Sequence, residues 1–575
     1  MDHQSDQRSR CRRMDQAPWG ARFGGLASLL LASCGAGGIE TGGDPADQDP
    51  GTPLQDELDP ASHPANPEDQ FRFLSRATFG PNEADFTRLG QIGYGAWLDE
   101  QLALPGTHHR PPLEALQSAT GSLIPIHRQD VWWSVAVTSP DQLRQRVAFA
   151  WSELFVISDD DPALFQNVLG VADYYDVLVD GAFSNYRDLL EDVARSPAMG
   201  VYLSMHKNVP SEPGSNLHPD ENFAREIMQL FSIGLVQLAP DGSVLASPGG
   251  DPASTYEQED VEEIARAFTG WNFAGATNWE NPEPSFEPME HWSEYHDQNG
   301  KSVLDGTVLP AGQSGQEDLD QILDALFEHP NVGPFVANHL IRRLVTSNPS
   351  PGYVQRVAQV FADDGTGERG DLGEVVRAVL LDDEAFGGLD LNPTSYGKLR
   401  EPLLRVTALW RAFDGVPPEG VYTLGQAELF LGQAPLSAPT VFNFFQPHHA
   451  PPGPVSQAGL VAPELQLADE VRMPLSTNML RKLVYQGHAD TPVTGDDQVW
   501  MDFSDELELA ATPPALIDHL DLLLLGGTMS TPMRTALIEY LGEVSMTFGG
   551  LEPGLQRVLE AVFLILISPE GAMQP

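Results

Sequence analysis

Cysteine is almost absent from this chain of 575 residues, which contains only Cys11 and Cys34. Both lie near the N-terminus, so the rest of the chain can form neither a disulfide framework nor a cysteine-based zinc site or nucleophile. Basic residues are also few, because 32 Lys and Arg stand against 82 Asp and Glu and give a formal net charge of −50. Such a surface repels phosphate backbones, and we therefore predict no nucleic-acid partner.

Long apolar runs are missing as well, and no segment reaches the roughly 20 residues of a membrane-spanning helix. The apolar stretch 23–31 follows the arginine-rich residues 8–13 and Arg22, an order typical of a signal peptide. It runs into Leu31-Ala32-Ser33-Cys34, which resembles the lipobox of bacterial lipoproteins. We therefore predict a lipoprotein-type signal peptide over residues 1–33 and lipidation at Cys34. An ordinary signal peptide or a chance apolar run is the alternative, and either Met1 or Met14 can be the start.

Residues 34–68 are rich in Gly, Pro, Asp and Glu and contain almost no large apolar side chains. A segment of this composition cannot bury a core, so it predicts a disordered, acidic tether. No later segment has the same composition, and we predict a single large domain over residues 69–575. The expected location is the cell envelope, outside the cytoplasm, with the lipid on Cys34 as membrane anchor.

The usual catalytic signatures are missing too. The chain has no Gly-x-Ser-x-Gly elbow, no Walker loop, no His-Glu-x-x-His and no dinucleotide fingerprint. Familiar hydrolase, kinase and dehydrogenase classes therefore lack their sequence marks here.

Helical periodicity dominates the part of the chain that follows the tether. The strongest helices are expected over 220–233 and 260–268, further helices are expected over 143–157 and 555–567, and Asn82 is expected to cap a helix. Strand signals are sparse and are best at Gly234 to Leu245 and at Lys301 to Leu309, each with an Asp-Gly turn. The predicted fold class is mainly α, a large multi-helix domain with one or two small β-hairpins.

The densest polar motif runs from His218 to Glu226. Glu221 and Arg225 are four residues apart and can pair on one helical face, and Glu226 adjoins them. These residues, with Glu263 on the following helix, are the candidate catalytic groups. They either line a pocket with His218 at its rim or form a structural network of ion pairs.

A second polar stretch offers weak candidates for metal ligands, namely His291, His296 and Asp297, to which His218 is added. Imidazole and carboxylate suit a divalent metal, but this spacing matches no established ligand motif, and a solvated loop is the alternative. His448-His449 has the same standing. The acidic loop 363–371 fails the calcium-loop register, because Glu368 stands where glycine is needed; a turn that caps the following helix explains it better.

Three further residues are candidates for binding. Trp271 follows a Thr-Gly pair at a helix end and is a candidate platform for a sugar or a peptide, with a core position as the alternative. Arg144 and Arg146 lie on the helix expected over 143–157 and are candidates for the same pocket as Glu226.

Several segments together resemble the domain-of-unknown-function 1800 family (DUF1800) of bacterial proteins. They are Arg76–Pro81, Leu143–Val147, His218–Glu226, Phe268–Trp271, Lys398–Pro402 and Pro439–Phe444. The resemblance implies an exported protein, often encoded beside a second exported protein that resembles sulfatases and phosphatases. It supplies no catalytic residue set.

Two functions of different classes follow as hypotheses. The first is a lipid-anchored binding or assembly component of the cell envelope that works with an exported partner, such as the sulfatase/phosphatase-like neighbour. The alternative is an extracytoplasmic hydrolase that uses Glu226 or Glu221 with Arg225, assisted by a metal at His218, His291 or His296.

Overall fold

The computed structural model describes residues 64 and 66–574, except 213, 215, 305, 392, 393, 489–497 and 545–550. The predicted signal peptide, Cys34 and nearly all of the predicted tether lie outside these residues. Helix α2 (Pro67–Ala77) begins with a cap from the Asn66 side chain, which accepts a hydrogen bond from the Asp69 amide. The last two residues assigned to the tether therefore belong to a helix.

The described chain is mainly helical, as predicted. The first part contains α2, α3 (Glu83–Ala103), α4 (Arg110–Thr120), α5 (Pro125–Thr138), α6 (Gln142–Ser152), α7 (Val168–Asp180), the 3-10 helix η3 (Gly181–Phe183), α8 (Tyr186–Arg195), α9 (Pro197–Tyr202), α10 (Asn222–Gln229), α11 (Gln258–Ala267) and the 3-10 helix η4 (Ser293–Tyr295).

The second part continues this pattern to the C-terminal strand. It contains α12 (Gly315–Glu328), α13 (Val332–Leu344), α14 (Pro351–Ala362), α15 (Leu372–Leu381), α16 (Asp383–Leu391), α17 (Pro402–Ala412), α18 (Ala427–Leu431), α19 (Pro454–Gln457), the 3-10 helix η5 (Pro463–Leu467), α20 (Arg472–Gln486), α21 (Ser504–Leu509), α22 (Pro513–Leu525), α23 (Thr531–Glu543), α24 (Pro553–Ile567) and α25 (Pro569–Ala572).

Local capping signals placed several helix starts correctly. The Asn82 side chain accepts a hydrogen bond from the Asp85 amide at the start of α3, as expected. Two helices end earlier than predicted. The helix expected to reach residue 157 stops at Ser152, and the helix expected over 220–233 is shortened to α10. In the second case the amides of Phe231 and Ile233 bond back five residues, a π-type pattern that ends the regular α-helix.

The described residues form three small antiparallel sheets of two strands each. The predicted hairpin at 301–309 is present, since β3 (Lys301–Val303) pairs with β4 (Thr307–Leu309). The segment 234–245 forms isolated β-bridges instead of regular strands, so this expectation was wrong in detail. The other two sheets join distant segments: β1 (Trp271–Asn272) pairs with β2 (Glu290–His291), and β5 (Lys398–Leu399) pairs with β6 (Met573–Gln574).

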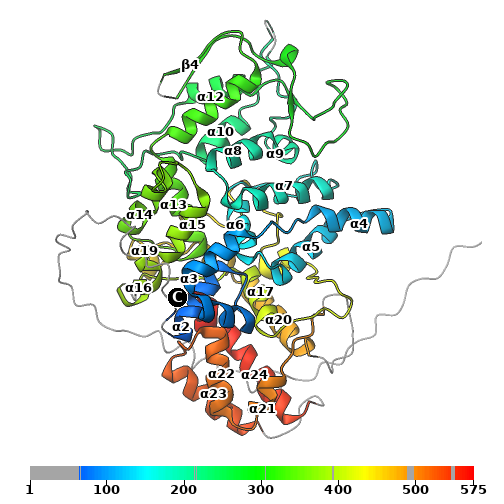
Figure 1. Ribbon diagram of the computed structural model, residues 1–575, viewed down its shortest axis with the longest axis vertical. Coiled ribbons are helices and arrows are strands. Elements are labelled where there is room, and N and C mark those ends of the chain that lie inside the picture. Colours follow the sequence, from blue (N-terminus) through cyan, green and yellow to red (C-terminus); the bar gives the residue numbers. More distant parts are fainter. Residues whose placement is uncertain are drawn as a thin grey trace, which may run out of the picture.

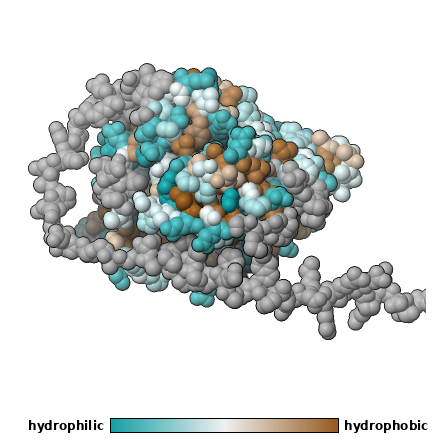
Figure 2. Space-filling model, turned by 90° about the horizontal axis from the view of Figure 1, so that it is seen from below, coloured by the Kyte–Doolittle hydropathy of each residue, from teal (hydrophilic) through white to brown (hydrophobic). Residues whose placement is uncertain are grey.

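The helices form an elongated body (Figure 1). Helices α8 to α12 lie at one end, α21 to α24 lie at the other, and α6, α7, α13 and α17 lie between them. Most buried apolar side chains make one continuous cluster from Phe73 to Leu566, dense in tryptophan and tyrosine, and Leu113, Val168 and Ala172 form a second, small cluster. The view onto the α21–α24 end shows apolar and hydrophilic residues interspersed on that face (Figure 2). Among the described helices, none combines the length and apolarity that crossing a membrane would need.

Candidate functional site

The predicted catalytic segment lies on α10. Glu221 precedes the helix and pairs with Arg225, with 2.8 Å between carboxylate oxygen and guanidinium nitrogen, and both side chains are 37% exposed. Glu226 lies beside them, and burial raises the pKa of its carboxyl against the opposing effect of Arg225. Its Oε2 atom is buried and has no hydrogen-bond partner. None of the three residues lines a cavity described below.

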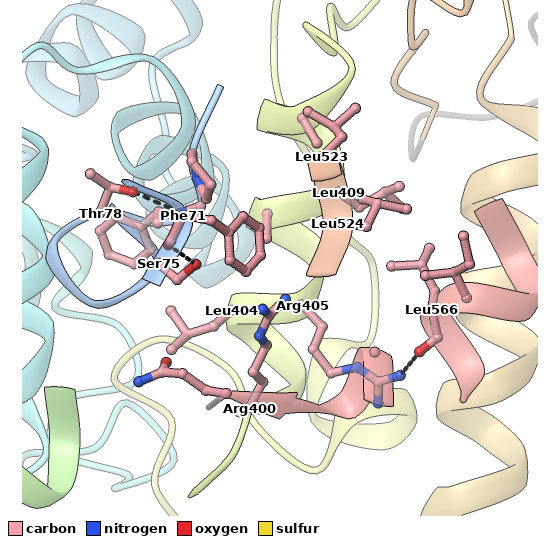
Figure 3. A pocket seen from close by; sticks show the side chains of 18 residues that line it. Phe71, Ser75, Thr78, Arg400, Leu404, Arg405, Leu409, Leu523, Leu524 and Leu566 are labelled. Atoms are coloured by element: carbon pink, nitrogen blue, oxygen red, sulfur yellow. Dashed lines mark hydrogen bonds between the residues drawn. The ribbon is translucent and has the colours of Figure 1, made fainter. Parts of the chain in front are cut away.

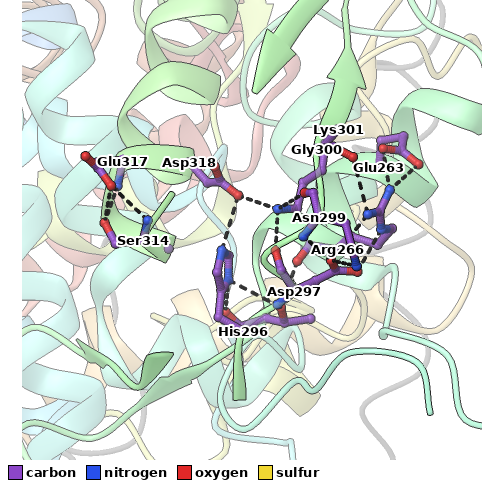
Figure 4. Close-up of polar contacts among 12 residues, drawn as sticks. Glu263, Arg266, His296, Asp297, Asn299, Gly300, Lys301, Ser314, Glu317 and Asp318 are labelled. Carbon is purple, nitrogen blue, oxygen red and sulfur yellow. Dashed lines mark hydrogen bonds and ion pairs between the residues drawn. The ribbon is translucent and has the colours of Figure 1, made fainter. Parts of the chain in front are cut away.

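The structure brings Glu263, His296 and Asp297 into one polar network with Arg266, Asn299, Lys301 and Asp318 (Figure 4). Arg266 binds Glu263 at 2.6 Å and Asp297 at 2.9 Å. Burial opposes ionisation of Asp297, but hydrogen bonds from Arg266 and Asn299 outweigh it and lower the pKa of Asp297 to about 2.

The inner part of this network is closed to solvent. Lys301 and Asp318 approach to 2.7 Å with side chains that are 2% and 0% exposed, and the His296 ring reaches Asp318 at 3.3 Å. The network joins α11, the β3 strand and the first turn of α12, and we interpret it as structural.

His291 lies against the His296 ring, with the ring centroids 4.8 Å apart. Its Nε2 atom accepts a hydrogen bond from the Gly315 amide at the start of α12. Burial, with a contribution from His296, lowers the pKa of His291 to about 4, so the ring is a neutral acceptor at the helix start. In the described part of the chain, no group of three or more His, Cys, Asp or Glu side chains is placed to hold a metal ion.

The remaining ligand candidates do not converge with this network. His218 is exposed. His448 contacts Arg342 at 3.2 Å, and burial lowers the pKa of its ring. In the acidic loop, carboxylate oxygens of Asp363 and Asp364 accept backbone amides of the same loop. Asp371 caps α15 by accepting the Glu374 amide, in agreement with the predicted capping turn.

Trp271 takes the core position that was the alternative to a binding platform, because its side chain is completely buried. It lies in β1, which packs against β2, where no ligand can reach its face. Arg144 is likewise not a pocket residue: its guanidinium donates to backbone carbonyls of Leu102, Leu104 and Val179 and lies over the Phe183 ring. Arg144 shares no contact with Glu226.

Arg146 belongs to a second, central network of charges, and it too is fully buried. Its Nη2 atom donates to the Arg343 carbonyl at 2.8 Å. Lys398 binds Glu464 at 3.1 Å, and Arg343 binds Glu153 at 3.4 Å. Asn443 also donates a hydrogen bond to Glu153, at 3.2 Å. Arg146, Lys398 and Asn443 come from three of the segments that carry the family resemblance, and these segments therefore meet in the central network.

Two carboxyls in this central network share a hydrogen bond. Burial, opposed by Arg343 and aided by the nearby Glu401, raises the pKa of Glu153 to about 8. Burial also opposes ionisation of Glu401, but Lys398 and Arg343 lower its pKa below the ordinary value. Oε2 of Glu153 and Oε1 of Glu401 receive no hydrogen bond from any described N–H or O–H group, and one proton between the two carboxyls satisfies both. Both side chains are closed to solvent, so the pair is structural.

An acidic cleft of about 370 Å³ lies at the α21–α24 end of the body. The cleft is built by α2, α3, the turn after α17, and α21 with α22. Its apolar wall contains Phe86, Phe413, Leu522 and Leu523. Its polar lining consists of Gln70, Glu83, Asp414, Asp502, Ser504, Asp505, Glu506 and His519. A second, open hollow of about 460 Å³ shares Glu83 and Asp414 with it.

The electrostatics of this cleft are one-sided. Five carboxylates line it, and no lysine or arginine does. His519 Nε2 lies 2.7 Å from Glu506, whose side chain is 4% exposed, and this hydrogen bond raises the pKa of His519. Asp414 holds a left-handed backbone (φ 44°), which directs the turn after α17 along the cleft. The arrangement can bind a cation and can also orient an imidazole.

Sequence reasoning missed this cleft entirely. The only local sign of the cleft in the sequence is the run Asp502-Phe503-Ser504-Asp505-Glu506, which contains three carboxylates and no basic residue. Glu83 and Phe86 lie more than 400 residues before this run, and Phe413 and Asp414 lie almost 90 residues before it, so no local pattern marks them as neighbours.

Comparison with known proteins identifies the family of the chain. The model of the family described as "Protein of unknown function (DUF1800)" matches residues 72–572, and thus nearly the whole chain after the predicted tether. No curated protein and no solved structure shows significant similarity to the chain. The ordered segments quoted above and this match lead to one conclusion: the chain belongs to the DUF1800 family.

Proposed function

We propose that this protein is a lipid-anchored, extracytoplasmic binding component of the cell envelope, and that its acidic cleft binds a basic segment of an exported partner. The proposed anchor rests on the lipobox-like residues 31–34 and on the acidic composition of the segment that follows them.

The observation that carries the proposed binding is the composition of the cleft. Five carboxylates line the cleft without a lysine or arginine in the same lining, although Arg88 lines the adjoining hollow; they create a negative potential, which low-dielectric walls focus into the cleft. The apolar wall adds contact area for aliphatic side chains. The volume falls within the usual ligand range of about 300–1,000 Å³ and suits a few side chains of a peptide segment. A strand or loop in which basic and apolar residues alternate matches both features.

The resemblance to the DUF1800 family implies a sulfatase/phosphatase-like exported neighbour. A basic segment of such a protein is the occupant that we propose for the cleft. The strong negative charge of the whole chain also favours a positively charged partner, because it speeds the encounter with a basic surface.

An acid–base enzyme is the second candidate, since His519 and its partner Glu506 line the same cleft. The hydrolase expected at Glu221, Arg225 and Glu226 has less support, because those residues line neither the cleft nor the hollow beside it. Replacing His519→Gln separates the two candidates: an enzyme loses turnover of a bound peptide or ester, whereas a binding site keeps its occupant.

The anchor is tested by feeding cells an alkyne-tagged fatty acid and identifying the labelled protein. Cys34→Ser abolishes the label and releases the protein from membranes. Cys11→Ser is the matched control, because Cys11 is the other cysteine of the chain, and it leaves the label unchanged. Recovery of an unlabelled wild-type protein from the cytosol would refute the anchor.

Binding in the cleft is tested with a fluorescent peptide in which lysine and leucine alternate, and with a glutamate–leucine peptide for comparison. The double variant Asp414→Asn, Asp505→Asn removes two charges with little change in shape. Each lost charge costs about 0.5–1 kcal/mol in a partly exposed site, so the affinity falls roughly 5- to 30-fold.

The matched control is Glu419→Gln, Glu508→Gln, which alters exposed residues of the same turn and the same helix that do not line the cleft. This control binds the basic peptide as the wild type does. Equal affinity for both peptides, or an equal loss in the two double variants, would contradict the proposed site.

A further inference from the structure

A small cavity lies beside the acidic cleft, between α2, α17, α22 and α24, and shares Ala412 and Leu523 with its lining. Its volume is about 30 Å³, enough for about two water molecules at roughly 10–15 Å³ each. Most of its wall is apolar, and its only charged residues are Arg400 and Arg405. Two segments that carry the family resemblance line it, because Thr78, Phe79, Gly80 and Pro81 face the same space as Arg400.

Arg400 stands immediately before the first turn of α17. Its guanidinium lies 5.4 Å from the centroid of the Phe71 ring, and its Nη2 atom is buried without a hydrogen-bond partner. The N-terminus of α17, which carries partial positive charge, follows Arg400 directly and therefore does not compensate the positive charge of its guanidinium. Burial, and then the neighbouring Arg405, lower the pKa of Arg400 to about 10, so this guanidinium remains charged at neutral pH.

Arg405 lies on the second turn of α17. Its Nη2 atom donates to the Leu566 carbonyl in the last turn of α24, and its Nε atom is buried without a partner. Burial lowers the pKa of Arg405 to about 10, which again leaves the charge in place at neutral pH. Figure 3 shows the Arg400 guanidinium near the Phe71 ring and that of Arg405 turned toward Leu566.

Neither guanidinium forms an ion pair with a carboxylate of the described chain, and no carboxylate lines the cavity. Among the other buried arginines, Arg343 pairs with Glu153 and Arg128 pairs with Asp159, and Arg146 lies in the field of Glu401 and Glu153 without a direct ion pair. A buried charge without a counter-ion is strongly unfavourable, and two charges of the same sign beside one cavity repel each other. The cavity therefore favours a negatively charged occupant.

We propose that this cavity binds a small inorganic anion of the size of chloride, held by Arg400 and Arg405. The volume admits a halide and excludes phosphate and organic acids, which need several times more space. The occupant would join α17 to α2 and α24, so the proposed role is a stabilising anion site that is independent of the acidic cleft.

The test uses the full chain with Cys34→Ser, which keeps it free of lipid, and measures the excess line width of chlorine NMR on titration with sodium chloride. We expect saturable broadening at chloride concentrations up to about 100 mM, reversed by bromide and unaffected by phosphate. If the dissociation constant is about 10 mM, the ratio of folded to unfolded protein rises about tenfold over the same range of chloride concentration.

Arg400→Gln abolishes the broadening. Arg144→Gln is the matched control, because it removes a partly buried arginine that donates to carbonyls on another face of the protein, and it leaves the broadening unchanged. Arg400→Lys keeps the charge but loses the planar fork, and it weakens chloride binding about tenfold even if Arg400→Gln does not fold.

Three results would overturn the proposal. The first is the absence of saturable broadening in the wild-type chain, and the second is an unchanged titration in folded Arg400→Lys. The third is displacement by phosphate at lower concentration than bromide, which would contradict the size argument. Each of these outcomes is independent of peptide binding in the acidic cleft.

Discussion

The proton shared by Glu153 and Glu401 predicts a specific dependence of stability on pH. With a native pKa of about 8, Glu153 holds its proton where an unfolded chain, with an ordinary pKa of 4.5, has released it. Between these values the unfolded state binds fewer protons, so the contribution of Glu153 to stability falls as the pH rises. It is complete below the unfolded pKa and is lost as the pH passes through about 8.

Glu153→Gln isolates this contribution, because glutamine resembles the protonated carboxyl and does not titrate. One pKa unit corresponds to about 1.4 kcal/mol, so over three pH units the free energy of unfolding of the wild type falls by about 4 kcal/mol relative to the variant. The variant is thus close to the wild type near pH 5 and distinctly more stable than it near pH 8.

The assay is denaturant unfolding of both proteins at several pH values between these limits, with Glu259→Gln, at an exposed position, as baseline. The infrared band of the protonated carboxyl gives a second reading that does not require reversible unfolding; it disappears in Glu153→Gln. A difference in stability that stays constant across this pH range would refute the shared proton, because it would mean that Glu153 is ionised throughout.

Three further predictions concern the network of Lys301 and Asp318 and its neighbours. Lys301→Ala leaves the buried carboxylate of Asp318 without its cation and lowers the free energy of unfolding by about 3–5 kcal/mol; a loss below about 1 kcal/mol in denaturant unfolding would contradict this. Trp271→Ala empties a fully buried site and costs about 3–5 kcal/mol, measured in the same way, while peptide binding in the acidic cleft stays unchanged. His291 stays neutral until the pH falls to about 4, because its ring accepts the Gly315 amide; an NMR titration of the ring with a midpoint near the ordinary value of 6.5 would argue against this contact.

Much of the fold was predictable because its signals are local. The apolar run 561–567 indicated a buried C-terminal helix and lies in α24. The Asn82 cap needs only its own next three residues. The hairpin of β3 and β4 needs two short β-prone runs and a turn between them. Where a helix end depends on distant partners, as after Ser152, the prediction ran too long, because the periodicity continues although the helix stops.

The candidate sites were far less predictable, because they join segments that are remote in the sequence. Gln70 and His519 line one cleft, and Phe79 and Leu566 line one cavity, yet hundreds of residues separate the members of each pair. No spacing rule reports such proximity. The residues chosen for their local density, Glu221 to Glu226, form an ion pair and a partly buried carboxyl on α10 outside both cavities.

Composition and order alone determined the acidic charge, the nearly cysteine-free body, the mainly helical fold class and the family, because these depend on residue identity and short-range pattern. Only the tertiary structure decided which polar residues are closed off and which face a cavity. Trp271 and Arg146 look like binding residues in the sequence and are fully buried, whereas Asp414 and Arg400 look ordinary and line cavities. The physical reason is that burial and partners arise from the packing of distant helices, and these set the cost of a charge and therefore its role.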